Sequence, residues 1–283
     1  MSRPAEGSVT QSAVTTPLLL HPLPAFLPYW VAPSYSLGPF TLQIFGIFVA
    51  AGVLLAARLM VRAAARQGLD PQPLQDFPIW GLLGGLLGGH LMHVLLYHPD
   101  ELRGFGLLRV WDGLSSTGGV LGGAVAAIWF FRRLRVPFAR YADALALGVA
   151  PGWAVARVGC FAVHDHPGVL TQFPLAVAFP GGARHDLGLY DALVLGALSL
   201  LLYALLRRRL LEGRLLPLLA VLYSLVRFGL DFLRAGADYP YSDARYFGLT
   251  PAQYVCMVLF TWGTWKLLRP EARATSARPA QAA

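Results

Sequence analysis

The sequence has few charged residues, which make up 13% of its 283 positions, whereas an average soluble domain is roughly a quarter charged. Hydrophobic residues make up 56% of the chain, and its mean hydropathy is +0.54. These values exclude an ordinary water-soluble enzyme and an intrinsically disordered chain. The two cysteines, Cys160 and Cys256, are too few for a disulfide framework or for a zinc site built from cysteines.

Four uncharged stretches are long enough to cross a hydrocarbon core of about 30 Å. They cover residues 40–57, 77–99, 114–131 and 246–265. Three shorter runs, 144–156, 192–206 and 215–226, reach that length only by including Arg157, Asp191 and Arg227, respectively. Ionisable residues inside a membrane span are costly and usually functional. The sequence therefore predicts an all-α, polytopic integral membrane protein with about seven transmembrane helices.

Basic residues gather after the first, third, fifth and seventh of these segments. The positive-inside rule then places the N-terminus outside and the C-terminus in the cytoplasm. The members are Arg58, Arg62, Arg66, Arg132, Arg133, Arg135, Arg140, Arg207, Arg208, Arg209, Arg214, Lys266, Arg269 and Arg273. The net charge of +8 is therefore interpreted as a topology signal and as contact with anionic membrane lipids, and no nucleic-acid partner is expected.

The chain divides into three parts. Residues 1–35 are expected to form an external arm, because five prolines between positions 14 and 33 exclude a spanning helix. A signal peptide is the weaker interpretation of this arm. Residues 36–269 are predicted to form the seven-helix domain, and residues 270–283 a disordered cytoplasmic tail.

Paired glycines recur in the second and third segments. Such small-xxx-small patterns let helices approach closely in lipid. Close packing is the favoured interpretation, and a groove for an acyl chain is the alternative. The glycines are Gly84, Gly85, Gly88, Gly89, Gly118, Gly119, Gly122 and Gly123.

On this topology, polar side chains from five segments lie at the level of the outer leaflet. Arg157 lies in the outer third of the fourth segment. Arg227, Asp231 and Arg234, at i, i+4 and i+7, are expected on one face of the sixth. Arg227 and Asp231 would neutralise each other as a structural ion pair, but three guanidinium groups outnumber the one nearby carboxylate. The excess positive charge favours a phospholipid headgroup site.

Four histidines lie at the same level, His90, His93, His164 and His166. Zinc would accept such ligands together with Asp165, but no HExxH motif is present, and neither a metal nor another cofactor is predicted. Proton handling or the satisfaction of polar groups is the commoner role of such histidines. Cys160 lies three residues after Arg157, so it is either a reactive thiol or, as we favour, a small core residue.

Five elements of the sequence, taken together, resemble those of the prolipoprotein diacylglyceryl transferase family. Residues 110–119 read V-W-D-G-L-S-S-T-G-G and resemble the family stretch V-W-D-G-G-M-S-F-H-G-G, with one residue fewer. Residues 157–168 are similar to the signature region that begins G-R-x-G-N-F, and residues 184–191 to R-H-P-x-Q-L-Y-E. Residues 227–234 resemble F-R-x-x-x-E-F-x-R, and residues 248–253 resemble G-L-x-x-x-Q. The matches run in order from about residue 36 to 268.

The resemblance implies a fold, a place and a reaction. The family has seven transmembrane helices in the bacterial plasma (inner) membrane, with an active site facing the outer leaflet. The implied reaction moves the diacylglyceryl group of phosphatidylglycerol to the thiol of a lipobox cysteine in a secreted prolipoprotein, releasing glycerol 1-phosphate. Phosphatidylglycerol, lipobox-containing prolipoproteins and membrane lipids are the implied partners.

The site residues are predicted from the polar side chains at the level of the outer leaflet and from the motifs that resemble the family. Arginines aimed at the leaving phosphate would stabilise the charge that develops on it, and a thiol needs a base because little of it is ionised at pH 7. The predicted catalytic residues are Arg157, Arg227, Asp231 and His90. The predicted substrate contacts are Arg157, Gly159, Phe161, Asp165, Arg184, Tyr190, Arg234, Thr117, Gly118 and Gly119.

The chain departs from the family pattern where protons are handled. Thr117 stands at the motif histidine, Phe45 at the first-helix tyrosine, Cys160 and Val163 at the signature asparagines, and Asp165 at the glutamate. A substitute base is expected among the four histidines, with His90 favoured for its helical rigidity. Three functions are considered: the transferase, a non-catalytic or repurposed member that binds anionic phospholipid or lipoprotein precursors, and a small-molecule transporter.

Overall fold

The computed structural model describes residues 27–37, 40–96, 98–99, 113–236 and 244–269. In these ranges the chain forms α1 (Ile44–Arg66), α2 (Gln72–Leu96), α3 (Ser116–Arg133), α4 (Phe138–Val163), α5 (Leu187–Arg207), α6 (Leu215–Leu230) and α7 (Pro251–Leu268), and a 3-10 turn, η3 (Asp231–Leu233), follows α6. A helix forms in each of the seven predicted segments. The greater part of the predicted arm and the predicted tail lie outside the described residues.

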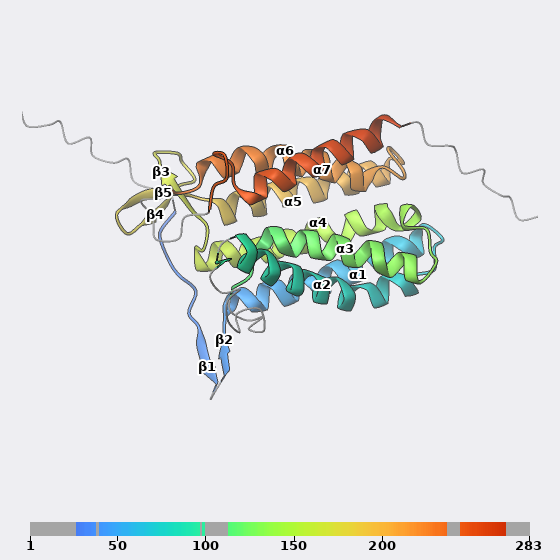
Figure 1. Cartoon of the computed structure of the whole chain (residues 1–283), viewed down its shortest axis with the longest axis horizontal. Coiled ribbons are helices and arrows are strands. Elements are labelled where there is room, and N and C mark those ends of the chain that lie inside the picture. Colours follow the sequence, from blue (N-terminus) through green and yellow to red (C-terminus); the bar gives the residue numbers. More distant parts are fainter. Residues whose placement is uncertain (1–26, 38–39, 97, 100–112, 237–243, 270–283) are drawn as a thin grey trace, which may run out of the picture.

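Consecutive helices run in opposite directions alongside one another (Figure 1). In that view, α1 to α4 form one layer and α5 to α7 form the other. Helix α4 joins the two layers, because it packs against α1 in its own layer and against α5 and α6 in the other, while α2 packs on α3 and α6 on α7. The starts of α1, α3, α5 and α7 therefore gather at one end of the bundle, together with the ends of α2, α4 and α6.

Five helices are long and apolar enough to cross a membrane: α1, α2, α4, α5, and α6 with η3. Helices α3 and α7 have 18 residues each and carry basic residues in their last turns, Arg132 and Arg133 in α3 and Lys266 in α7. Large apolar side chains are exposed on the outer faces of the bundle, for example Ile79 (66% exposed) and Leu200 (73%). Such surfaces fit contact with lipid. The chain is a multi-pass helical membrane protein, while the number of spans stays a prediction.

Two small antiparallel sheets at one end of the bundle were not predicted from the sequence. The strands β1 (Tyr35–Leu37) and β2 (Phe40–Leu42) pair with each other, so α1 begins at Ile44 instead of residue 40. Between α4 and α5, β3 (Pro167–Leu170), β4 (Val177–Phe179) and β5 (Gly182–Asp186) form a sheet in the order β3–β5–β4. The predicted all-α class thus describes the bundle, to which the described residues add five short strands, two before α1 and three between α4 and α5.

The predicted glycine patterns form the contact between α2 and α3. A Cβ atom on Gly88 would lie 2.6 Å from the carbonyl oxygen of Gly118, and one on Gly122 would lie 2.9 Å from the Cα of Gly88. The contact is looser at Gly119, where a Cβ atom would lie 3.6 Å from the oxygen of Gly85. The structure therefore supports close packing at this seam.

A buried carboxylate joins α4 to α6 at the opposite end of the bundle from the β3–β5–β4 sheet. Asp143 accepts hydrogen bonds from the backbone N–H groups of Gly213, at 2.5 Å, and Leu215, at 2.9 Å. Backbone donors at a helix start lack partners within the helix, and no cap comes from the side chain of Arg214, the N-cap residue of α6. The Asp143 carboxylate therefore caps α6 in place of an N-cap side chain, and it links the start of α6 to α4.

Candidate active site

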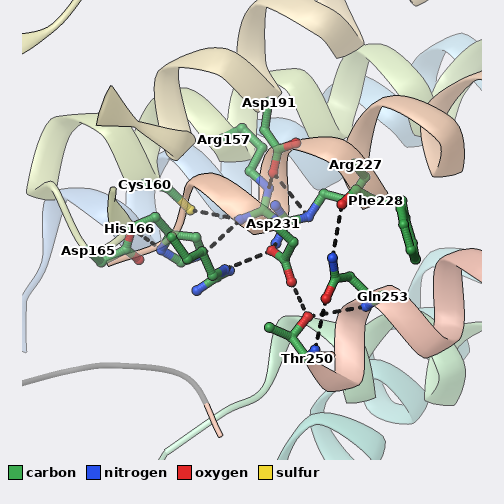
Figure 2. Close-up of polar contacts among 11 residues, drawn as sticks. Arg157, Cys160, Asp165, His166, Asp191, Arg227, Phe228, Asp231, Thr250 and Gln253 are labelled. Carbon is green, nitrogen blue, oxygen red and sulfur yellow. Dashed lines mark hydrogen bonds and ion pairs between the residues drawn. The ribbon is translucent and has the colours of Figure 1, made fainter. Parts of the chain in front are cut away.

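Three arginines and two aspartates meet where α4 and α6 approach the β3–β5–β4 sheet (Figure 2). Arg157 Nε lies 3.3 Å from Asp191 Oδ2, and Arg227 Nε lies 3.7 Å from the same oxygen. Asp231 Oδ1 lies 2.7 Å from Arg227 Nη2 and 2.8 Å from Arg234 Nε. We refer to these five residues as the arginine cluster.

The arginine cluster is largely buried. Arg157 and Arg227 are each 4% exposed, Asp231 is 1% exposed and Asp191 is fully buried. The sequence-based count of one carboxylate was wrong, because Asp191 enters the cluster from α5. Guanidinium groups held in this way present planar sets of N–H donors, which suit an anionic ligand.

Several buried polar atoms of the arginine cluster have no hydrogen-bond partner among the described residues. They are the donors Arg157 Nε and Arg227 Nη1 and both carboxylate oxygens of Asp191, whose contacts with the arginines are ion pairs without hydrogen-bond geometry. Buried polar groups are nearly always paired, so an orphaned donor indicates a missing ligand or water. A phosphate oxygen accepts hydrogen bonds from guanidinium groups and would satisfy such a donor.

Arg234 reaches the arginine cluster by a route that the sequence did not predict. Helix α6 ends at Leu230, and Arg234 follows η3 in an extended conformation, so it does not occupy a helical i+7 position. Its backbone forms an antiparallel bridge with Gly168 of β3. The side chain still returns to Asp231, and the bridge fastens the sheet to the end of α6.

The first turn of α7 supports the arginine cluster from the other side. Thr250 and Gln253 form a capping box, in which Gln253 Oε1 accepts a hydrogen bond from the backbone N–H of Thr250 at 2.9 Å. The Thr250 hydroxyl donates to Asp231 Oδ2, and Gln253 Nε2 donates to the carbonyl of Phe228 at 3.1 Å. Both residues belong to the segment that resembles the family pattern G-L-x-x-x-Q, but no role in the site was predicted for them.

His166 joins the arginine cluster through Arg157. Arg157 Nη1 lies 3.1 Å from His166 Nε2 and 3.6 Å from Cys160 Sγ. On the other side of the ring, Asp165 Oδ1 lies 2.6 Å from Nδ1, off the direction of a hydrogen bond, so this contact is mainly electrostatic. Cys160, Asp165 and His166 carry metal-ligand atoms within 4.8 Å of one another. Because the Arg157 guanidinium lies against two of the three, the group is a poor site for a cation.

The chain that forms this site is similar in sequence to known proteins over most of its length. Residues 33–269 match the family model described as prolipoprotein diacylglyceryl transferase. The chain belongs to this family. A relative from Chromohalobacter salexigens, named phosphatidylglycerol–prolipoprotein diacylglyceryl transferase, is 32% identical over 208 residues, which cover 71% of this chain and 78% of that protein. A relative of the same name from Nitratidesulfovibrio vulgaris is 31% identical over 245 residues, which cover 83% and 92%.

Three of the candidate bases in this transferase-family chain have contacts outside the arginine cluster. The ring of His93 packs against that of His98 at 4.7 Å. His90 Nδ1 lies 3.3 Å from the carbonyl oxygen of Gly113, just before α3. His164 ends α4 in a left-handed conformation, and its Nδ1 lies 2.6 Å from Oδ2 of Asp186, the N-cap residue of α5. Among the described contacts, His166 is the histidine that reaches Arg157.

The predicted substrate contacts on α3 and α4 lie where helices meet. Thr117, Gly118 and Gly119 are in the first turns of α3, next to α2. A Cβ atom on Gly159 would lie 2.7 Å from Phe48 Cβ of α1. The Phe161 ring packs edge-on against His164 at 5.2 Å. Their roles toward substrate stay predictions.

Two further predicted contacts, Arg184 and Tyr190, stabilise the sheet and its junction with α5. Arg184 Nη1 donates a hydrogen bond to the carbonyl of Gly168 at 3.0 Å. The Tyr190 hydroxyl lies 2.8 Å from His185 Nδ1. His185 lies in β5, outside the membrane-spanning helices, and its partial burial lowers its pKa below the usual 6.5.

Proposed function

We propose that this protein transfers the diacylglyceryl group of phosphatidylglycerol to the thiol of the lipobox cysteine in secreted lipoprotein precursors. The observation that carries the proposal is the arginine cluster, in which Arg157 and Arg227 are buried and each has a donor, Nε and Nη1 respectively, with no hydrogen-bond partner among the described residues. Relatives named for this activity align over most of the chain and support it.

The charge of the arginine cluster suits the lipid and the reaction. The phosphodiester of phosphatidylglycerol carries one negative charge, and Arg157 and Arg227 offer planar N–H groups to its oxygens. Attack by the thiolate on the glycerol carbon breaks that carbon's bond to the phosphate oxygen, and glycerol 1-phosphate leaves with additional negative charge. Guanidinium groups held by Asp191 and Asp231 stabilise this charge where it develops.

The proposed orientation brings both substrates to the arginine cluster. Seven helices cross the bacterial plasma (inner) membrane, with the N-terminus outside, the C-terminus in the cytoplasm and the cluster at the outer leaflet. Basic residues at the ends of α1, α3, α5 and α7 support this, because those ends lie opposite the cluster (Figure 1). Phosphatidylglycerol then enters from the outer leaflet, and the secreted precursor reaches the same site from outside.

Lipid transfer to a peptide tests the proposed activity. The purified protein in phosphatidylcholine nanodiscs, with and without phosphatidylglycerol, is incubated with a lipobox peptide, and the peptide's mass gain is measured. We expect a diacylglyceryl adduct only with phosphatidylglycerol. The variants Arg157→Gln and Arg227→Gln should transfer about 100-fold more slowly or worse, while Arg58→Gln, at an exposed position of α1, should match the parent.

Two other results of this experiment would contradict the proposed site or the proposed function. If both cluster variants bind lipid and transfer at the parent rate, the arginines are structural ion-pair partners and the site is wrong. If the parent binds phosphatidylglycerol but yields no adduct, the second function is favoured, a family member that binds anionic phospholipid or lipoprotein precursors without transfer. The departures at Thr117 and Phe45 motivate that alternative.

Reporter fusions test the orientation. A cytoplasm-dependent reporter fused after Arg269 should be active, and a reporter inserted at Gly181, in the turn between β4 and β5, should be active only outside. Labelling of Arg208→Cys by a membrane-impermeant reagent added from outside would contradict the model.

A further inference from the structure

We propose that His166 takes the proton from the acceptor thiol and that Asp165 positions its ring. The inference rests on the transferase activity proposed above and assigns a catalytic residue within that same site. Only a few per cent of an ordinary thiol is ionised at pH 7, so a base must lie within reach of the attacking sulfur.

The contacts of His166 determine which ring nitrogen carries the proton. Arg157 Nη1 lies 3.1 Å from Nε2, and because a guanidinium only donates hydrogen bonds, Nε2 is the acceptor. The ring proton is therefore on Nδ1, and Asp165 Oδ1 lies 2.6 Å from that nitrogen, off the N–H direction. The basic nitrogen thus points into the arginine cluster, where the phosphate is proposed to bind (Figure 2).

Lipid binding would uncover this basic nitrogen. Arg157 is both the donor that occupies Nε2 and a proposed ligand of the phosphate. When Nη1 turns to a phosphate oxygen, Nε2 loses its hydrogen-bond donor and can accept a proton. Cys160 Sγ, 3.6 Å from the same Nη1, shows that a sulfur atom fits beside this guanidinium. The exchange implies that the lipid binds before the thiol is activated.

A cavity of about 340 Å³ opens beside Asp165, the residue next to His166. It lies between residues 32–34, the start of α1 and the end of α4. Its lining residues include Ser34, Gln43, Phe45, Val163 and Asp165. The Asp165 side chain is 38% exposed and that of His166 is 16% exposed. The site is thus open to the surface at Asp165, and this is the side from which the proposed peptide cysteine enters while the lipid occupies the arginine cluster.

The neighbouring titratable groups are already engaged. His164 is held by Asp186 and is 3% exposed in its side chain. Asp231 is bound by two arginines and by Thr250. Of these three residues, His166 is the one whose basic nitrogen is directed at the arginine cluster and whose side chain is partly exposed to solvent.

The proposed step balances without a further reactant. The S–H proton moves to His166 Nε2, and the thiolate sulfur forms a bond to the glycerol carbon. That carbon's bond to the phosphate oxygen breaks, and its electron pair stays on the oxygen of glycerol 1-phosphate. His166 then returns to its neutral form by giving its proton to the departing phosphate.

A glutamine at position 166 separates a base from a structural partner. His166→Gln keeps an acceptor for Arg157 but cannot take a proton at neutral pH, so it should bind phosphatidylglycerol like the parent and transfer about 100-fold more slowly or worse. Asp165→Asn should show a smaller loss. His98→Gln, at an exposed position beyond α2, serves as the control and should transfer at the parent rate.

Two further readouts would not respond to a merely structural role. In His166→Ala, imidazole added to the buffer should restore part of the rate. The residual rate of this variant should also rise as the pH approaches the acceptor thiol's own pKa near 8.5, narrowing the gap to the parent. The titratable groups facing the ring are Arg157 and Cys160 of α4 and Asp165. The pH dependence of the transfer rate is therefore also measured for the Cys160→Ala variant, to exclude a contribution from the Cys160 thiol.

The outcomes distinguish this inference from the proposed function. Transfer by His166→Gln at the parent rate, in a preparation whose parent is active, overturns the base and leaves the transferase intact. Failure of the parent itself to lipidate the peptide, with phosphatidylglycerol bound, overturns the proposed function and the base together. Loss of lipid binding in both His166→Gln and His166→Ala makes the residue a structural support of Arg157 and also overturns the base.

Discussion

The Thr250 hydroxyl donates a hydrogen bond to Asp231 Oδ2, across the gap between the first turn of α7 and the end of α6. Thr250 is also the N-cap of α7, since its side chain accepts a hydrogen bond from the backbone N–H of Gln253 at 3.2 Å. One hydroxyl thus both starts a helix and holds the carboxylate that pairs with Arg227 and Arg234. The position of the Asp231 carboxylate in the arginine cluster therefore depends on α7 beginning at this threonine.

Removing this hydroxyl should weaken both the helix and the site. Thr250→Val should lower the free energy of unfolding by about 1–2 kcal/mol, the usual cost of losing an N-cap, and should weaken binding of phosphatidylglycerol. Thr250→Ser keeps the hydroxyl and should behave like the parent. Thermal unfolding and lipid titration in the same nanodiscs measure the two effects, and a Val variant equal to the Ser variant in both would refute the dual role.

Asp191 should be more important for stability than an ordinary surface aspartate. Asp191→Asn leaves Arg157 and Arg227 with less compensation in a fully buried place, and breaking a buried ion pair costs about 3–5 kcal/mol. We expect a large loss of unfolding free energy, whereas Asp76→Asn, on an exposed turn of α2, should change little. Equal midpoints of denaturation for the two variants would show that Asp191 is not needed to hold the arginines.

Two adjacent glycines of α3 should respond in opposite ways to alanine. A Cβ atom on Gly122 would lie 2.9 Å from Gly88 Cα and collide with the carbonyl oxygen of Gly84, so Gly122→Ala should destabilise the α2–α3 contact by about 1–3 kcal/mol. A Cβ atom on Gly123 would have no neighbour closer than 3.8 Å, so Gly123→Ala should be neutral or slightly stabilising. Thermal unfolding of the pair tests this directly.

A histidine placed at position 117 should substitute for His166. Thr117→His puts the residue of the family motif back into the first turn of α3, and in the His166→Gln background it should recover at least about tenfold of the lost transfer rate. Thr117→Gln, of similar size, is the matched control and should recover nothing. Recovery by both substitutions would mean that bulk, and not a base, is what position 117 contributes.

Acid should destabilise the β3–β5–β4 sheet through His185. Burial lowers the pKa of His185 in the folded protein, so the unfolded chain binds the proton more readily. The stability that neutral His185 contributes is present above the unfolded pKa of about 6.5 and is lost as the pH falls below it. The parent should therefore lose more thermal stability than His185→Gln between pH 7.5 and 5.5. The exposed His98→Gln variant should follow the parent, and identical curves for all three proteins would contradict this role.

The helices and the arginines of the site could be predicted from the sequence, because both are marked by patterns of neighbouring residues. Apolar runs mark the seven helices, and Arg157 and Arg227 stand out because each is a charge at the edge of such a run. The strands β3, β4 and β5 were not predicted, because each has five residues or fewer and lacks a clear alternating pattern.

The partners of those arginines could not be deduced from spacing. Asp191 comes from a different helix, and whether it reaches Arg157 depends on how α4 and α5 pack. Arg234 was expected on a continuous helix, yet the helix ends at Leu230 and the side chain still returns to Asp231. His166 was one candidate among four histidines, and only the three-dimensional contact with Arg157 distinguishes it.

The carboxylate of Asp143 affects how Arg157 and Arg227 are aligned at the other end of the bundle. It holds the start of α6, at Leu215, against the first turns of α4. From there to the arginine cluster, α4 rises 14 residues to Arg157 and α6 rises 12 residues to Arg227, or about 21 Å and 18 Å at 1.5 Å per residue. Two parallel helices fixed at one end cannot slide along each other, so their arginines arrive at nearly the same depth and can share Asp191. A single side chain at one face of the membrane domain thus sets the alignment of the two guanidinium groups at the other.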